Sequence, residues 1–281
     1  MLKQRVITAL ILTAVFLSAL FGLSPSLFAV FIGVVVLIGS WEWANLSSCT
    51  VYWKRISYVV VIALVLLATA RATGLLAADQ QGFNLPVVKS ILIIAVAWWA
   101  LALLLVQGYP SSAVLWGHPL MRLVIGVLVL VPTWLALVYV RFQPQGAWLV
   151  VMIAAIVAAA DTGGYFTGRK FGKHKLAPSV SPGKTLEGFA GGVISNVLLA
   201  ALVAYLSASN FLLLLAIILP TSLFSVLGDL LESMVKRHAG VKDSGVILPG
   251  HGGILDRVDS ITAAAPVFAL AVLASGWVLG Q

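Results

Sequence analysis

The composition of this 281-residue chain excludes a soluble globular protein. Hydrophobic residues make up 61% of it, charged residues only 9%, and the mean hydropathy is +1.09. A soluble domain carries roughly 25% charged residues, so this chain lacks the charge to cover a surface in water. The net charge of +8 does not indicate a nucleic-acid partner, because Lys and Arg flank membrane spans for topological reasons alone.

Apolar runs recur along the whole chain, and several have the roughly 20 residues that cross a bilayer. Divided at Pro, Gly and charge clusters, the sequence predicts an all-α, polytopic transmembrane bundle of about nine spans. We interpret the first run as a span, because no clear small-residue cleavage site of a signal peptide follows it. The expected spans are 5–23, 26–47, 56–77, 87–107, 122–140, 147–167, 188–206, 211–231 and 260–279.

The distribution of basic residues favours a cytoplasmic N-terminus. With that orientation, 14 of the 17 Lys and Arg residues fall in inside segments, and only Arg71, Lys89 and Arg141 fall outside. This asymmetry is what the positive-inside rule requires.

Acidic residues divide the chain into two regions. Only Glu42 and Asp79 precede residue 160, whereas seven acids lie between 161 and 259. We therefore expect residues 1–145 to be a transmembrane scaffold without assigned chemistry. Residues 146–281 are the expected catalytic region, with cytoplasmic loops 168–187 and 232–259.

Two segments of this second region carry candidate ligand-binding residues. Asp161 lies in an apolar helix, where a carboxylate is costly unless it faces a polar cavity or a cation. The alternative is a carboxylate at the wet end of its span, paired with Arg169 or Lys170. Downstream, Ser181, Lys184 and Thr185 cluster before the next helix, whose N-terminal amides favour an anion; a simple helix start is the alternative.

The richest segment pairs carboxylates at helical spacing. Asp229 and Glu232 are three residues apart, as are Asp256 and Asp259, so each pair shares a helix face. Two helices that bring such pairs together can form an oxygen-ligand site for Mg²⁺. The alternative is a solvated, salt-bridged loop, because Lys and Arg are interspersed.

The run 233–259 resembles the signature of the phosphatidate cytidylyltransferase (CDP-diacylglycerol synthase) family of bacterial type. The family pattern is Ser-x-apolar-Lys-Arg, then Lys-Asp-x-Ser/Gly, then Pro-x-His-Gly-Gly-apolar-x-Asp-Arg-apolar-Asp. The likeness extends upstream to about residue 158. Its fixed positions are met by Ser233, Lys236, Arg237, Lys242, Asp243, Gly245, Pro249, His251, Gly252, Gly253, Asp256, Arg257 and Asp259.

The resemblance implies a multi-span enzyme of the bacterial inner membrane whose active site faces the cytoplasm. Its partners would be CTP, phosphatidate, membrane lipid and a second copy in a homodimer, with no nucleic acid. Its cofactor would be Mg²⁺, with a second cation as a further option. The implied catalytic residues are Asp229, Asp256, Lys242, His251 and Arg257. Those implied for the nucleotide are Asp161, Ser181, Lys184, Thr185, Lys236 and Arg237, and those for metal are Asp229, Asp256 and Asp259.

The expected reaction transfers the cytidylyl group of CTP to phosphatidate, giving CDP-diacylglycerol and pyrophosphate for phospholipid synthesis. Two alternatives stay open. A CTP-dependent lipid or polyprenol kinase would use similar nucleotide chemistry, and a cation or proton transporter would use intramembrane acids as a relay.

Overall fold

The computed structural model describes residues 2–78, 82–248, 250–277 and 279, with side chains from Val6 onward. Asp79 and Pro249 lie outside the described residues, as do the side chains of Lys3 and Arg5. The long helices are α1 (Leu2–Gly22), α2 (Pro25–Leu46), α3 (Tyr52–Ala72), α5 (Leu85–Gln107), α7 (Pro119–Phe142), α8 (Gly146–Phe171), α9 (Leu186–Ser207), α10 (Phe211–His238) and α11 (Leu255–Ser275). Short elements are η1 (Leu75–Ala77), α6 (Ala113–Trp116), β1 (Lys175–Ala177) and β2 (Ser181–Thr185).

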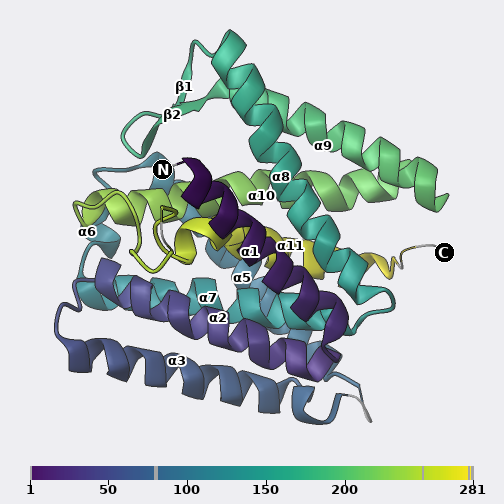
Figure 1. The fold of residues 1–281 in the computed structure, drawn as a ribbon, viewed down its shortest axis with the longest axis horizontal. Coiled ribbons are helices and arrows are strands. Elements are labelled where there is room, and N and C mark those ends of the chain that lie inside the picture. The colour runs from purple at the N-terminus through teal and green to yellow at the C-terminus, as the bar shows by residue number, and fades with distance from the viewer. Residues whose placement is uncertain (1, 79–81, 249, 278, 280–281) are drawn as a thin grey trace.

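The all-α prediction is confirmed, apart from one small β-hairpin. Among the described residues, eight helices are long and apolar enough to cross a membrane, and the apolar part of α1, Val6–Gly22, is shorter. Successive long helices run in alternate directions, so the end of α2, α6, the hairpin and the loop between α10 and α11 gather at one end of the bundle (Figure 1). We call this the site end.

Two helix boundaries near the site differ from the predicted spans. α10 continues to His238 and α11 already begins at Leu255, so the loop is only 239–254. The sequence predicts the wider loop 232–259 because charged residues are frequent there. In the structure, Lys236 pairs with Glu232 and Asp256, which lets the charged turns remain helical and packed.

The β-hairpin between α8 and α9 was not predicted. Strands β1 and β2 pair antiparallel, with Lys175 opposite Thr185 and Ala177 opposite Ser181. Thr185 ends β2 and also caps α9, because its hydroxyl accepts a hydrogen bond from the Gly188 N–H at 3.1 Å. The hairpin therefore fixes Lys184 one residue before the cap.

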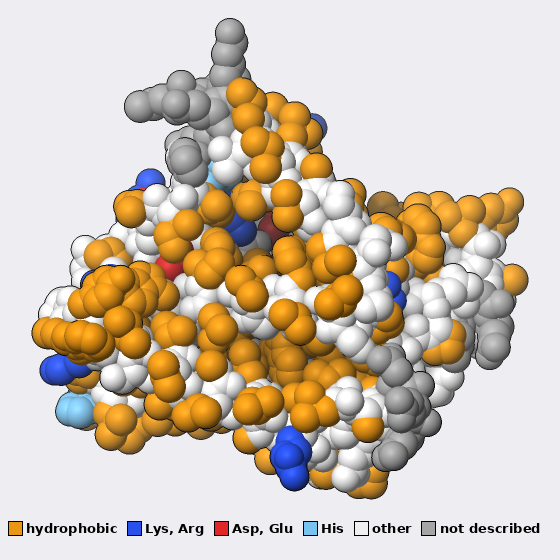
Figure 2. All heavy atoms as spheres, turned by 60° about the horizontal axis from the view of Figure 1, so that its bottom comes forward, with side chains coloured by type: hydrophobic (Ala, Val, Ile, Leu, Met, Phe, Trp, Pro, Cys, Tyr) orange, Lys and Arg blue, Asp and Glu red, His pale blue; other side chains and the backbone are white. Residues whose placement is uncertain are grey.

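The outside of the bundle suits a lipid environment. Figure 2 shows a face covered largely by hydrophobic side chains with few charges among them. Inside, α8 packs on α9 and α10 packs on α11, while α7 lies between α2 and α11. The N-terminal helices are thus packed directly against the helices that carry the acidic pairs.

Replacing Gly191 by Ala is expected to destabilise the contact between α8 and α9. A Cβ at Gly191 would overlap the side chain of Thr167, whereas one at Gly22 would meet nothing within 4 Å. Overpacking of this kind lowers the free energy of unfolding by about 1–3 kcal/mol. Thermal unfolding in detergent measures it, with Gly22→Ala as the control for helix propensity. Equal melting temperatures for the two variants would contradict the close packing.

Candidate active site

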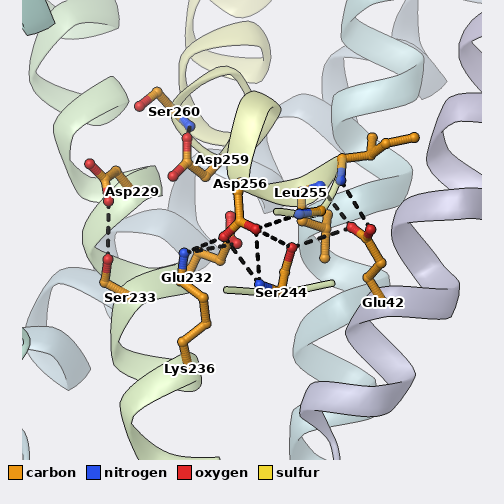
Figure 3. Close-up of polar contacts among 12 residues, drawn as sticks. Glu42, Asp229, Glu232, Ser233, Lys236, Ser244, Leu255, Asp256, Asp259 and Ser260 are labelled. Carbon is orange, nitrogen blue, oxygen red and sulfur yellow. Dashed lines mark hydrogen bonds and ion pairs between the residues drawn. The ribbon is translucent and has the colours of Figure 1, made fainter. Parts of the chain in front are cut away.

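The two predicted acidic pairs meet where α10 packs against α11. Asp229 and Glu232 come from α10, and Asp256 and Asp259 come from the first turns of α11 (Figure 3). Lys236 lies between the helices, with its Nζ 2.7 Å from Asp256 Oδ1 and 3.2 Å from Glu232 Oε1. Lys236 therefore joins a carboxylate of α10 to one of α11, and a metal site at these acids stays a prediction.

The two oxygens of Asp256 face different surroundings. Oδ1 faces the Lys236 ammonium, whereas Oδ2 accepts hydrogen bonds from the Ser244 N–H at 2.9 Å, the Ser244 hydroxyl at 2.9 Å and the Gly253 N–H at 2.7 Å. The loop 239–254 therefore holds mainly Oδ2, with one longer contact from the Ser244 N–H to Oδ1 at 3.2 Å, and Oδ1 is directed at the charged cluster (Figure 3).

The hairpin adds a second lysine to the cluster. Lys184 Nζ lies 2.6 Å from Asp229 Oδ2, and the Ser233 hydroxyl donates to Asp229 Oδ1 at 3.1 Å. Asp161 of α8 interacts electrostatically with Lys184 and Asp229, and Asp259 interacts with both of these as well. Residues from α8, β2, α10 and α11 thus form one charged group.

A cavity of about 360 Å³ opens beside this group, between α8, β2, α9 and α10. Asp161, Arg169, Lys184 and Thr185 line it with polar groups. The rest of its wall is largely apolar, formed by Ala160, Leu176, Phe189, Val193 and Val226. A cavity with both kinds of wall suits a ligand that carries a phosphate on an apolar body.

The donor set fits a hard divalent cation. The cluster, which we define as Asp161, Asp229, Glu232, Asp256 and Asp259 with Lys184 and Lys236, carries three more negative than positive charges when all are ionised. Within the described part of the chain, no three His, Cys, Asp or Glu side chains form a ready-made metal site. Mg²⁺ does not need one, because it binds through one or two carboxylates and completes its shell with water and substrate phosphates.

Several predicted residues lie away from these contacts. Lys242, Arg237 and Arg257 are exposed, and Arg237 Nε donates to the Val180 carbonyl at 3.3 Å. His251 is half-buried in the loop 239–254, and Ser181 is half-buried at the start of β2. Their proposed roles in catalysis and nucleotide binding stay predictions.

Comparison with known proteins identifies the family to which this geometry belongs. The sequence matches the Cytidylyltransferase family over residues 3–275. It is 42% identical to the phosphatidate cytidylyltransferase of Pseudomonas aeruginosa over 99% of both chains. The chain belongs to the phosphatidate cytidylyltransferase family. The family's enzyme from Haemophilus influenzae is 40% identical over 95% of this chain and 97% of that one. The Staphylococcus aureus enzyme is 45% identical over 47% of this chain and 52% of that one.

Membership of the phosphatidate cytidylyltransferase family makes the chain a nucleotidyltransferase and a multi-pass membrane protein. The signature run 233–259 spans the end of α10, the loop 239–254 and the first turns of α11, so it contributes Lys236, Asp256 and Asp259 to the cluster together with the loop that holds Asp256.

One residue of the site was missed from the sequence. Glu42 of α2 is 2% exposed and reaches the loop and the first turn of α11 (Figure 3). The available signal was a carboxylate within an apolar run, which is costly unless it has partners. The partner could not be read from the sequence, because it lies more than 200 residues away.

Proposed function

We propose that this chain carries out the reaction of its family, the transfer of the cytidylyl group from CTP to phosphatidate, with Mg²⁺ held at the cluster. The observation that carries the proposal is the convergence of five carboxylates and two lysines from four separate segments beside an amphipathic cavity. Family membership supplies the reaction, and this arrangement supplies the place for it.

The reaction joins two polyanions, so charge repulsion is its first barrier. An oxygen of the lipid phosphate forms a bond to the α-phosphorus of CTP. The bond from that phosphorus to the bridging oxygen breaks, and pyrophosphate leaves with the electron pair. No general base is required, because a phosphate monoester is already ionised near neutral pH. Bound Mg²⁺ supplies neutralisation of phosphate charge in both the attacking and the leaving groups.

The residues of the chain hold and orient these charges. Asp229 Oδ2, Asp256 Oδ1 and Asp259 would hold the metal, since the ammonium groups of Lys184 and Lys236 already show where positive charge is favoured. With a substrate bound, the same two lysines would be available to phosphate oxygens as point charges. Arg169 on the cavity wall would add a donor suited to bidentate phosphate contact.

The location of the site suits its two substrates. CTP is water-soluble and phosphatidate lies in the leaflet, so the reaction belongs at a membrane surface. We place the site end at the cytoplasmic face of the bacterial cytoplasmic membrane, because the excess of Lys and Arg falls at that end. A homodimer is the proposed assembly, on the family resemblance alone.

Purified protein reconstituted with phosphatidate is expected to release pyrophosphate from CTP and to form CDP-diacylglycerol. EDTA should stop the reaction and added Mg²⁺ should restore it. The product separates the alternatives: a kinase would release CDP and a phosphorylated alcohol, and a transporter would move ions across sealed vesicles without nucleotide. Absence of CDP-diacylglycerol from a reconstituted, folded sample would refute the proposal.

A further inference from the structure

Glu42 joins the N-terminal half of the chain to the signature segment. Its carboxylate accepts hydrogen bonds from the Ile254 N–H at 3.0 Å and the Leu255 N–H at 2.9 Å. Its Oε2 also lies 3.3 Å from the Ser244 hydroxyl. The buried Glu42 side chain of α2 therefore contacts both Ser244 in the loop 239–254 and the start of α11, which together surround Asp256.

Glu42 supplies hydrogen-bond acceptors that the start of α11 lacks. The first N–H groups of a helix have no partner within it, and the N-cap here, Ile254, has no polar side chain to accept one. Glu42 accepts these bonds from another helix. Its negative charge also suits the positive end of the helix dipole. The position of the first turn of α11, which carries Asp256, is thus determined by α2.

Ser244 links Glu42 to the carboxylate of Asp256. A hydroxyl has one hydrogen, and Asp256 Oδ2 is nearer to it, at 2.9 Å, than Glu42 Oε2. Ser244 therefore donates to Asp256 while it stays packed against Glu42. The outcome is that Oδ2 is fixed and Oδ1 is directed at Lys236 and the cluster.

The glycines of the signature point to the same conclusion. A Cβ at Gly245 would lie 2.5 Å from Glu42 Oε1, and one at Gly253 would lie 2.6 Å from both Glu42 oxygens. The absence of a side chain at these two positions leaves the space that Glu42 fills. The loop and the Glu42 carboxylate fit each other closely.

We propose that Glu42 is a positioning residue for the reaction, acting through Ser244 and the first turn of α11 to aim Asp256 at the metal and the phosphates. The inference rests on the proposed function. It predicts that loss of the Glu42 carboxylate impairs the chemical step without any loss of direct contact to substrate.

Glu42→Gln is the first test, because it keeps the side-chain volume and removes one acceptor oxygen and the charge. Loss of a partner that orients a metal-binding group lowers activity or metal affinity by about 10- to 100-fold. We expect a fall of that size in kcat, a higher Mg²⁺ concentration for half-maximal rate and little change in the KM for CTP. Hydrogen exchange without substrate should be faster at the amides of Ile254 and Leu255.

Arg122→Gln is the matched control. Arg122 is buried, and it holds the end of the same helix α2 by donating to the Leu46 carbonyl and the Ser48 hydroxyl. This variant should lose stability but keep the wild-type Mg²⁺ dependence and the wild-type exchange at Ile254 and Leu255. If both variants alter these two readouts alike, Glu42 is only a packing residue and the proposal is wrong.

A double-mutant cycle tests the route through Ser244. Glu42→Gln and Ser244→Ala should be non-additive in kcat if both act on Asp256, and additive effects would contradict the route.

If Glu42→Gln does not accumulate as folded protein, Gly245→Ala provides a second variant. Its added methyl group presses on the same carboxylate and should give the same kinetic and exchange changes. Wild-type behaviour of that variant would overturn the proposal. An inactive wild-type protein in the same assay would instead refute the proposed function.

Discussion

Replacing Asp229 by Asn is expected to lower kcat by about 10²- to 10³-fold, the usual loss when one electrostatic stabiliser of a transition state is removed. The Asp229 side chain is 27% exposed, and Lys184 contacts its Oδ2, so the change removes a charge from an accessible part of the cluster at nearly constant volume. The protein should stay folded. Pyrophosphate release in phosphatidate-containing vesicles measures kcat, and thermal unfolding measures stability.

Ser233→Ala provides the control for this variant. It deletes the hydroxyl that donates to Asp229 Oδ1 and leaves the carboxylate charge in place. We expect this variant to lose less activity than Asp229→Asn, within the roughly 10- to 100-fold range for a group that orients a metal-binding carboxylate. Near-normal turnover of Asp229→Asn, or an equal loss in both variants, would reject the assignment of Asp229 as a metal-binding carboxylate.

Asp256→Asn is expected to abolish turnover and also to destabilise the protein. An amide presents one acceptor and one NH₂ donor group, so its NH₂ would face either the Lys236 ammonium or the N–H groups of Ser244 and Gly253. Both orientations set donors against donors in a place where the side chain of Asp256 is only 6% exposed. Breaking a buried pair from one side lowers the free energy of unfolding by about 3–5 kcal/mol.

A double variant separates the two effects of Asp256→Asn. Adding Lys236→Met removes the ammonium that has lost Asp256 and keeps only Glu232 as a partner, and it should recover part of the lost stability. Turnover should remain abolished, because the carboxylate is still missing. Recovery of turnover together with stability would show that Asp256 serves folding alone.

The sequence predicted the local geometry of the candidate site, which depends on spacing along single helices. Residues three apart on one helix share a face, so the pairing of Asp229 with Glu232 and of Asp256 with Asp259 followed from spacing. Hydropathy likewise predicted the helical bundle, because each span must bury its own backbone polar groups. These features do not depend on how the helices are packed.

Features that arise from packing could not be predicted in the same way. The predicted spans ended short of the observed helices at α10 and α11, where Lys236 pairs with Glu232 on its own helix and with Asp256 across the helix contact. The hairpin has strands of three and five residues, too short for a periodic pattern to show. The partners of Glu42 depend on α2 lying beside α11, which only the folded chain determines.

We propose that Asp229, Asp256 and Asp259 hold a divalent cation between CTP and the lipid phosphate. Anomalous diffraction from crystals grown with Mn²⁺ and a non-hydrolysable CTP analogue tests it most directly. We expect an Mn²⁺ peak at these carboxylates, in contact with the nucleotide phosphates and with Lys184 displaced from Asp229. A nucleotide bound with its metal elsewhere in the molecule would contradict it.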